Sequence, residues 1–133
     1  MTPAFDLPHA KFIVHTVAPL LDKDGRTRDE LLRQCYVQCL NAAEENGMES
    51  LAFCALGTGF YGFPQVPACE IALGTTLAWL RAHSEGVVRR VVFCMYGTNA
   101  RKIYPAMLGK LKADVEAEDG SGLGTPHPGE SKS

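Results

Sequence analysis

The sequence predicts an α/β fold with parallel strands, on three observations. An apolar run from Leu51 to Leu56 leads directly into a loop with three glycines, as a buried parallel strand does when it opens into a binding loop. Two further runs, at residues 11–17 and 87–96, are rich in β-branched residues. The segments between these runs repeat apolar residues at helical spacing. Strands that alternate with helices in this way predict parallel strands joined by right-handed crossovers.

The first predicted strand covers residues 11–17 and ends before Pro19. His15 lies inside it. A single histidine in an apolar strand is more often a hydrogen-bonded core residue than a catalytic group, and we predict the former. The polar, glycine-containing stretch from Leu20 to Arg26 predicts a loop.

A long helix is predicted next, ending near Asn46. Thr27, with Glu30 three residues later, is typical of a capping box at its start. Gly47 suits the left-handed conformation that ends many helices. The predicted buried face repeats at helical spacing and consists of Leu31, Leu32, Cys35, Tyr36, Cys39, Leu40 and Ala43.

The second strand, at about 50–56, and its glycine loop are followed by a predicted helix from Pro67 to about His83. Gly74 interrupts this helix at a cost of about 1 kcal/mol relative to alanine. The face predicted to pack on the sheet consists of Ala68, Ile71, Ala72, Thr75, Ala78 and Trp79.

The third predicted strand covers residues 87–96, and Arg89 and Arg90 mark its solvated start. Asn99 can cap a last helix, which Pro105 would kink or delay. From Ala113 onward the chain is rich in acids, glycine, serine and proline, so residues 113–133 predict a disordered tail.

Length and composition exclude several classes of protein. The 133 residues, 46% of them hydrophobic, can bury one core. A net charge of -2, from 13 basic and 15 acidic residues, predicts no nucleic-acid partner and no basic membrane patch. No apolar run has transmembrane length, and the first residues do not resemble a secretion signal, so we expect a cytoplasmic protein.

Five cysteines without CxxC spacing predict buried free thiols in a reducing compartment. Cys35 and Cys39 lie four residues apart and could supply half of a zinc site. Their apolar neighbours continue the same helical stripe, which favours core packing, and we predict no metal. A cysteine nucleophile would need a base or a helix N-terminus to lower its pKa, and the sequence shows neither.

The loop Gly57-Thr58-Gly59-Phe60-Tyr61-Gly62 is the strongest functional signal. Its glycines let the backbone approach a ligand closely, and a helix start follows, so strand, loop and helix predict a phosphate cradle. The same letters match the dinucleotide fingerprint GxGxxG. Phe63-Pro64 disfavours that alternative, because the residue before proline avoids helical geometry. A tight turn without a ligand remains the third possibility.

GTGFYGFP resembles the ligand loop of macro domains, the modules that bind ADP-ribose. The resemblance extends upstream to Phe12–Pro19, FIVHTVAP, and downstream to Ala68–Leu73, ACEIAL, and covers roughly residues 2 to 112. Gly57 replaces the family's usual serine and Ala18 a usual glycine. The segments Cys35-Tyr36, Cys39-Leu40 and Phe53-Cys54 look most like the zinc-containing bacterial and fungal branch.

The resemblance implies a three-layer α/β/α macro-domain-like fold with a small parallel sheet, formed by residues 1–112 as a partial macro domain. It implies that the ligand lies beyond the carboxyl ends of the strands. Tyr96 would pack on adenine, with an ordinary strand-end aromatic as the alternative. The residues implied to surround the diphosphate and ribose are Gly57, Thr58, Gly59, Phe60 and Tyr61.

The first residues, MTPAFDLP, correspond to the middle of a macro domain. The front portion of the family's domain carries the adenine-reading aspartate, the catalytic segment and, in the zinc branch, the metal ligands. We therefore expect weakened binding of ADP-ribose or ADP-ribosyl protein, with no cofactor. The alternatives are an ADP-ribosyl-protein hydrolase completed by another chain or by upstream sequence, and a structural or interaction remnant.

A consequence for the sheet follows from the same resemblance. The family places a strand of its front portion between the equivalents of Phe12–Val17 and Leu51–Leu56. We expect either that these two strands close up and pair, or that each keeps a row of unpaired backbone groups. An uncovered parallel edge is poorly stable in a small core, which predicts a homo-oligomer or a complementing chain.

Overall fold

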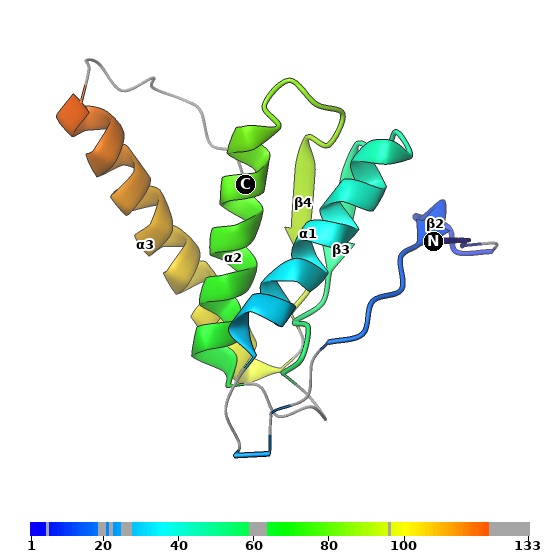
Figure 1. Ribbon diagram of the computed structural model, residues 1–133, viewed down its shortest axis with the longest axis horizontal. Coiled ribbons are helices and arrows are strands. Elements are labelled where there is room, and N and C mark those ends of the chain that lie inside the picture. The colour runs from blue at the N-terminus through cyan, green and yellow to red at the C-terminus, as the bar shows by residue number, and fades with distance from the viewer. Residues whose placement is uncertain are drawn as a thin grey trace.

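The computed structural model describes residues 1–4, 6–18, 21, 23–24, 28–58, 64–95 and 97–122. Its elements, shown in Figure 1, are the strands β1 (Thr2–Pro3) and β2 (Phe12–Ile13), helix α1 (Asp29–Glu45), strand β3 (Ser50–Phe53), helix α2 (Gln65–Ala82), strand β4 (Arg90–Phe93) and helix α3 (Thr98–Gly122). Strands alternate with helices after β2, which confirms the predicted α/β class.

Strands β3 and β4 form the parallel sheet. Their register pairs Ser50 with Arg90 and Phe53 with Phe93, and α2 connects them. Helix α2 packs against both α1 and α3 (Figure 1). Both strands lie inside the ranges predicted for them, and both are shorter than predicted.

The segment predicted as the first parallel strand forms a different structure. Only residues 12–13 are in a strand, and they pair antiparallel with β1. The prediction that residues 11–17 form a parallel strand is therefore wrong. A strand persists only where a neighbour accepts and donates its hydrogen bonds, and the neighbour that the fold supplies here is β1. His15 is exposed, with Nε2 3.0 Å from the hydroxyl of Thr2, so it is a hairpin residue and not a core residue.

Aromatic side chains join the sheet to the helices. Phe53 and Phe93 stack with ring centroids 5.7 Å apart, on one face of the sheet. Tyr36 of α1 meets Phe53 edge to face at 4.9 Å, and Tyr104 of α3 lies 5.9 Å from Phe93. The core therefore lies between this face of the sheet and the helices. The largest fully buried side chains are Tyr36, Leu32, Leu40 and Cys69.

Helix α1 begins at Asp29 with Arg28 at the N-cap position, where no side chain caps it, and Thr27 lies outside the described residues. Gly47 has φ 69°, as predicted for the end of the helix. The predicted face is buried except for Leu31, which is exposed in the first turn. The buried residues of α1 are Leu32, Cys35, Tyr36, Cys39, Leu40 and Ala43.

Helix α2 begins at Gln65, two residues before the predicted start at Pro67. Proline is accommodated there because residues in the first turn of a helix need no acceptor for a backbone N–H within the helix. Its buried face is wider than predicted, because α1 and α3 cover it from two sides. Thr75 is half-buried and Ala78 is exposed. The buried residues are Ala68, Cys69, Ile71, Ala72, Leu73, Thr76 and Trp79.

Helix α3 begins at Thr98, so Asn99 lies inside the helix and not at its cap. Pro105 also lies within the helix. The helix continues past position 112, where we predicted a disordered tail to begin, and ends at Gly122. The remainder of the predicted tail lies outside the described residues.

The carboxylate of Glu44 joins the end of α1 to the start of β4. Its oxygens accept hydrogen bonds from the backbone N–H of Val87 at 2.8 and 3.0 Å and of Val88 at 2.9 Å. Gly86 leaves room for this contact, since an added Cβ there would lie 2.3 Å from a Glu44 oxygen. Hydrogen bonds from the N–H of Val88, and then from that of Val87, lower the pKa of Glu44. The nearby His83 also lowers this pKa, and partial burial of the carboxylate opposes these effects.

A lowered pKa in the folded state makes this contact sensitive to acid. Its contribution to stability is complete above the ordinary carboxyl pKa of 4.5 and is lost as the pH falls through the lower, folded-state value. We expect Glu44→Gln to be less stable than the parent at neutral pH, with a difference that narrows below about pH 4.5. Urea unfolding of both proteins at a series of pH values measures this difference in stability. Glu45→Gln, at the exposed neighbouring position, is the control. A difference independent of pH would contradict the assignment.

Candidate functional site

The parallel pairing of β3 and β4 brings two loops to one edge of the sheet. Phe53 and Phe93 are opposite each other in the register, so the segments that follow them leave from the same edge. The first segment leads toward α2 and the second toward α3 (Figure 1). Ligands of open α/β sheets bind outside this carboxyl edge. The glycine loop and the predicted adenine contact therefore belong to segments that start side by side.

The first half of the glycine loop is held by two hydrogen bonds. The N–H of Leu56 donates to the hydroxyl of Tyr36 at 3.3 Å, and the hydroxyl of Thr58 donates to the carbonyl of Ala55 at 3.0 Å. Between these bonds Gly57 has φ 78°, a left-handed conformation that glycine adopts without steric cost. The buried Tyr36 on α1 thus positions the start of the loop. Burial of Tyr36 raises its pKa, so its hydroxyl remains protonated at neutral pH.

Of the predicted ligand residues, the structure describes Gly57 and Thr58. Gly59, Phe60, Tyr61 and Tyr96 lie outside the described residues. Gly97, directly after Tyr96, has φ 92° and begins the turn into α3. Because the hydroxyl hydrogen of Thr58 is used within the loop, this hydroxyl is not available as a donor to a ligand.

Helix α2 begins shortly after the glycine loop in the sequence, and its first turn has features that favour a nearby negative charge. Pro64 at the N-cap makes no side-chain cap, and the first turn carries no acidic residue, whereas α1 has Asp29 and Glu30 there. The first N–H groups of a helix and its dipole favour a negative charge. The side-chain oxygen of Gln65 is buried with no hydrogen-bond partner among the described residues. Gln65 lies three positions after the last glycine of the loop and is not among the site residues predicted from the sequence.

The cysteines divide into two groups. Cys35, Cys39 and Cys69 are buried, which confirms the predicted packing role of the first two. Cys54 and Cys94 are exposed, so the prediction of five buried thiols is wrong for them. They follow Phe53 and Phe93, and strand alternation turns them away from the core face.

The buried thiols are poorly suited to nucleophilic or metal chemistry. Burial, and secondarily Glu70, raises the pKa of Cys69 to about 11, and burial also raises that of Cys39. The Cys35 thiol donates to the carbonyl of Val17 at 3.4 Å. The raised pKa keeps Cys39 and Cys69 protonated, and protonated thiols are weak nucleophiles and weak metal ligands. In the part of the chain that the structure describes, no three histidine, cysteine or acidic side chains gather as a metal site would require.

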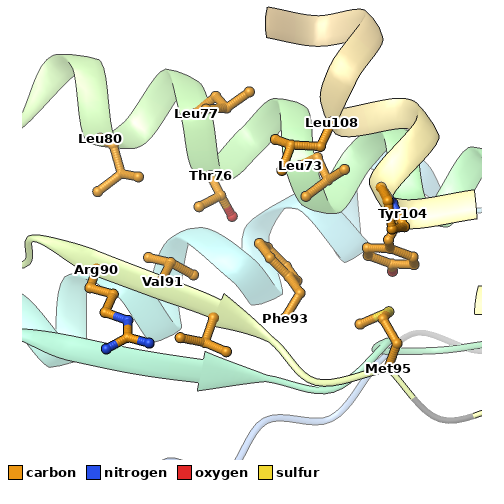
Figure 2. Close-up of a pocket in the computed structure, with 12 residues that line it drawn as sticks. Leu73, Thr76, Leu77, Leu80, Arg90, Val91, Phe93, Met95, Tyr104 and Leu108 are labelled. Carbon is orange, nitrogen blue, oxygen red and sulfur yellow. The ribbon is translucent and has the colours of Figure 1, made fainter. Parts of the chain in front are cut away.

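A separate apolar cavity of about 350 Å³ lies between α2, α3 and β4 (Figure 2). Leu73, Val91, Phe93 and Leu108 contribute to its wall. The hydroxyl of Thr76 turns toward the strand in Figure 2 and is buried without a hydrogen-bond partner among the described residues.

The helices that the structure describes include none long and apolar enough to cross a membrane. This finding agrees with the lack of any apolar run of transmembrane length in the sequence.

Two solved macrodomains resemble this chain in structure. A mutant macrodomain of Oceanobacillus iheyensis matches with a TM-score of 0.77 and 31% sequence identity, over 85% of this chain and 58% of that one. The Trypanosoma brucei macrodomain in complex with ADP-ribose matches with a TM-score of 0.60 and 37% identity, over 62% of this chain and 35% of that one.

Curated proteins of the same kind match in sequence. ADP-ribose glycohydrolase MACROD2 of Mus musculus is 36% identical over 143 residues, which cover 96% of this chain and 30% of the relative. Protein-ADP-ribose hydrolase of Treponema medium is 37% identical over 109 residues, which cover 81% of this chain and 41% of the relative. The chain thus spans less than half the length of these two relatives. The sequence model of the Macro domain matches residues 1–72, more than half of the chain, and the chain belongs to the macro domain family.

Proposed function

We propose that this chain binds ADP-ribose, free or attached to a protein, at the loop that begins at Gly57. The observation that carries the proposal is the left-handed conformation of Gly57 at the carboxyl edge of two parallel strands. The preceding residue, Leu56, is fixed by the hydrogen bond from its N–H to the hydroxyl of Tyr36. The uncapped start of α2 adds a favourable field for a diphosphate. The relatives named as ADP-ribose hydrolases, and the T. brucei macrodomain bound to ADP-ribose, support the choice of ligand.

In this proposal the backbone N–H groups from Gly57 to Tyr61 surround the diphosphate, and Tyr96 packs on the adenine ring. Gly59, in the middle of the loop, leaves space for the phosphate oxygens. Because backbone donors bind phosphate without a lysine or arginine, the site needs no basic cluster, which agrees with the net charge of -2.

The direct test is calorimetric titration of the chain with ADP-ribose. We expect micromolar or weaker affinity. Gly59→Glu should reduce binding more than tenfold, because its side chain and negative charge occupy the phosphate space. Gly109→Glu is the matched control, since Gly109 is exposed on α3 and an added Cβ there meets nothing within 4 Å. If Gly59→Glu titrates like Gly109→Glu, the loop assignment is wrong.

Hydrolysis of ADP-ribosyl protein is the second candidate, favoured by the names of the relatives. The residues assigned to the site supply backbone groups, a hydroxyl and aromatic rings, which position a substrate without activating water. We therefore expect the chain alone to bind without turnover. Release of ADP-ribose from a modified protein by the purified chain, lost on Gly59→Glu, would establish hydrolysis instead.

The proposal extends to the bounds of the domain, its location and its branch of the family. We place the macro-domain part of this chain at residues 1–112 and its location in the cytoplasm, where the five free thiols stay reduced. The cysteine pattern around Cys35 and Cys39 supports a place near the zinc-containing branch of the family. We also propose a homo-oligomer or a complementing chain for the sheet, because within the described residues β3 pairs with β4 alone.

A further inference from the structure

Cys54 and Cys94 are the two exposed cysteines of the chain, and all five cysteines lie among the described residues. Cys54 directly follows Phe53 at the end of β3, and Cys94 directly follows Phe93 at the end of β4. The register pairs Phe53 with Phe93, so the two cysteines are the next pair along the same strands. The N–H of Cys94 donates to the carbonyl of Phe53 at 2.7 Å, which holds the two strands together up to the cysteines.

The side chains of the two cysteines leave the sheet on the same face. The rings of Phe53 and Phe93 stack on the core face, with centroids 5.7 Å apart. Side chains alternate along a strand, so Cys54 and Cys94 are both directed to the opposite face. Ala52, which shares that face, is exposed as well. The two thiols are therefore neighbours on an open face of the sheet.

The spacing of neighbouring strands brings the two sulfur atoms within bonding reach. Paired residues of adjacent strands lie about 4.8 Å apart, and a disulfide requires a Cα–Cα distance of about 4.4–6.8 Å. The Cβ atoms must approach to about 3.5–4.5 Å, which is a movement of roughly 1 Å or less. Both cysteines lie just beyond the last strand residues, Phe53 and Phe93, where fewer ladder hydrogen bonds resist such a movement.

A groove of about 960 Å³ gives access to Cys54, which contributes to its wall. Residues 9–14 line one side of this groove and residues 47–54 the other. A small thiol or disulfide can therefore reach the Cys54 sulfur from solvent. Figure 1 shows β2 standing apart from β3, and the two strands belong to separate sheets. The expectation that these strands close up and pair directly is wrong.

We propose that Cys54 and Cys94 form a modification site, at which oxidised glutathione converts the two thiols into an intramolecular disulfide. The thiolate of one cysteine attacks a sulfur of oxidised glutathione, which forms a mixed disulfide and releases one glutathione thiolate. The thiolate of the second cysteine then attacks the protein sulfur of the mixed disulfide and releases the second glutathione. Two cysteine thiols are oxidised, one glutathione disulfide is reduced, and the two thiol protons pass to the released glutathione.

The other three cysteines are poor substrates for the same exchange. Cys35, Cys39 and Cys69 are buried, and thiol–disulfide exchange requires access to the attacking thiolate. They serve as internal controls, because they experience the same buffer in the same molecule.

The disulfide joins the starts of the two segments that leave the carboxyl edge of the sheet. Gly57 lies three residues after Cys54, and Gly97 lies three residues after Cys94. Because the Cβ atoms must move together, the bond is strained, and strained disulfides are more easily reduced. The modification is therefore reversible: it forms as the oxidised fraction of glutathione rises and is lost as that fraction falls.

The test is equilibration of the chain in glutathione buffers of increasing oxidised fraction. Acid stops the exchange, alkylation blocks the remaining thiols, and digestion with trypsin and chymotrypsin followed by mass spectrometry identifies the linked cysteines. We expect the Cys54–Cys94 link, within one chain, to be at least about tenfold more abundant than any other link. In concentrated urea its abundance should fall at least about tenfold, because the fold no longer holds the thiols together. Equal abundance in urea, or mixed disulfides with glutathione that never proceed to the link, overturns the proposal.

Matched variants test whether the strand register selects the pair. Cys54→Ser and Cys94→Ser each leave one exposed thiol and should stop at the mixed disulfide with glutathione. Ala52→Cys in the Cys54→Ser background moves the thiol two residues back on the same exposed face, to about 8 Å from Cys94 between Cα atoms. This distance is too long for a disulfide, so the link to Cys94 should be at least about tenfold less abundant than in the parent. If it forms as readily as in the parent, the register does not select the pair and the proposal fails. None of these measurements uses ADP-ribose, so they succeed or fail independently of the ligand site.

Discussion

The Tyr36→Ala variant should lose roughly 3–5 kcal/mol of stability, a large part of what a small domain possesses. Tyr36 is fully buried, its ring meets Phe53 at 4.9 Å and Phe93 at 6.4 Å, and its hydroxyl accepts the N–H of Leu56. Removal of the ring leaves a cavity between α1 and both strands of the sheet. Urea unfolding followed by circular dichroism measures the loss.

Tyr36→Phe separates the ring from its hydroxyl. It retains the packing, leaves the Leu56 N–H without its acceptor, and should cost about 1 kcal/mol. Because this hydrogen bond holds the start of the glycine loop, ADP-ribose affinity should also fall, measured by calorimetry where the variant is fully folded. If the phenylalanine variant loses as much stability as the alanine variant, the ring packing is not what stabilises this junction. If its affinity is unchanged, Tyr36 does not position the loop.

The Trp79→Ala variant should lose a similar amount, roughly 3–5 kcal/mol. The indole is 5% exposed, its N–H donates to the side-chain oxygen of Asn41 at 2.9 Å, and it stacks on His83 at 3.9 Å between ring centroids. It therefore joins the last turns of α2 to α1. Unfolding must be followed by circular dichroism, because Trp79 is the only tryptophan of the chain.

Trp79→Phe and Asn41→Ala are the matched variants. The first keeps an aromatic ring without the donor, and the second removes the acceptor and leaves a partly buried indole N–H unpaired. Each should cost about 1–3 kcal/mol, less than Trp79→Ala. A double variant Trp79→Phe, Asn41→Ala that costs the sum of the two single changes would show that the hydrogen bond contributes nothing.

The sequence was informative where structure depends on neighbouring residues. The spacing of Leu32, Tyr36 and Leu40 defined the buried face of α1, and Gly47 marked its end. The apolar run at 50–56 predicted β3 and the loop after it, and the left-handed Gly57 agrees with the glycine-dependent turn. Gly59, Phe60, Tyr61 and Tyr96, the other predicted ligand residues, remain predictions because they lie outside the described residues.

Sequence reasoning failed where a residue's environment depends on distant parts of the chain. Cys54 and Cys94 lie in apolar segments, yet they are exposed, because exposure depends on which face of the sheet the helices cover. The wider buried face of α2, with Cys69, Leu73 and Thr76, arises because two helices flank it. Hydrophobic periodicity describes one face of a helix and carries no information about how many neighbours it has.

By itself, the sequence determined the α/β class, the positions of the helices and of β3 and β4, and the glycine loop at the carboxyl end of β3. These features follow from side-chain period and from the backbone freedom of glycine, which are local properties. Only the tertiary structure decided that the segment after Lys11 pairs with β1 and not with β3, and that a groove stays open between them. Strand pairing requires a partner for each backbone donor and acceptor, and which partner is within reach depends on the whole fold.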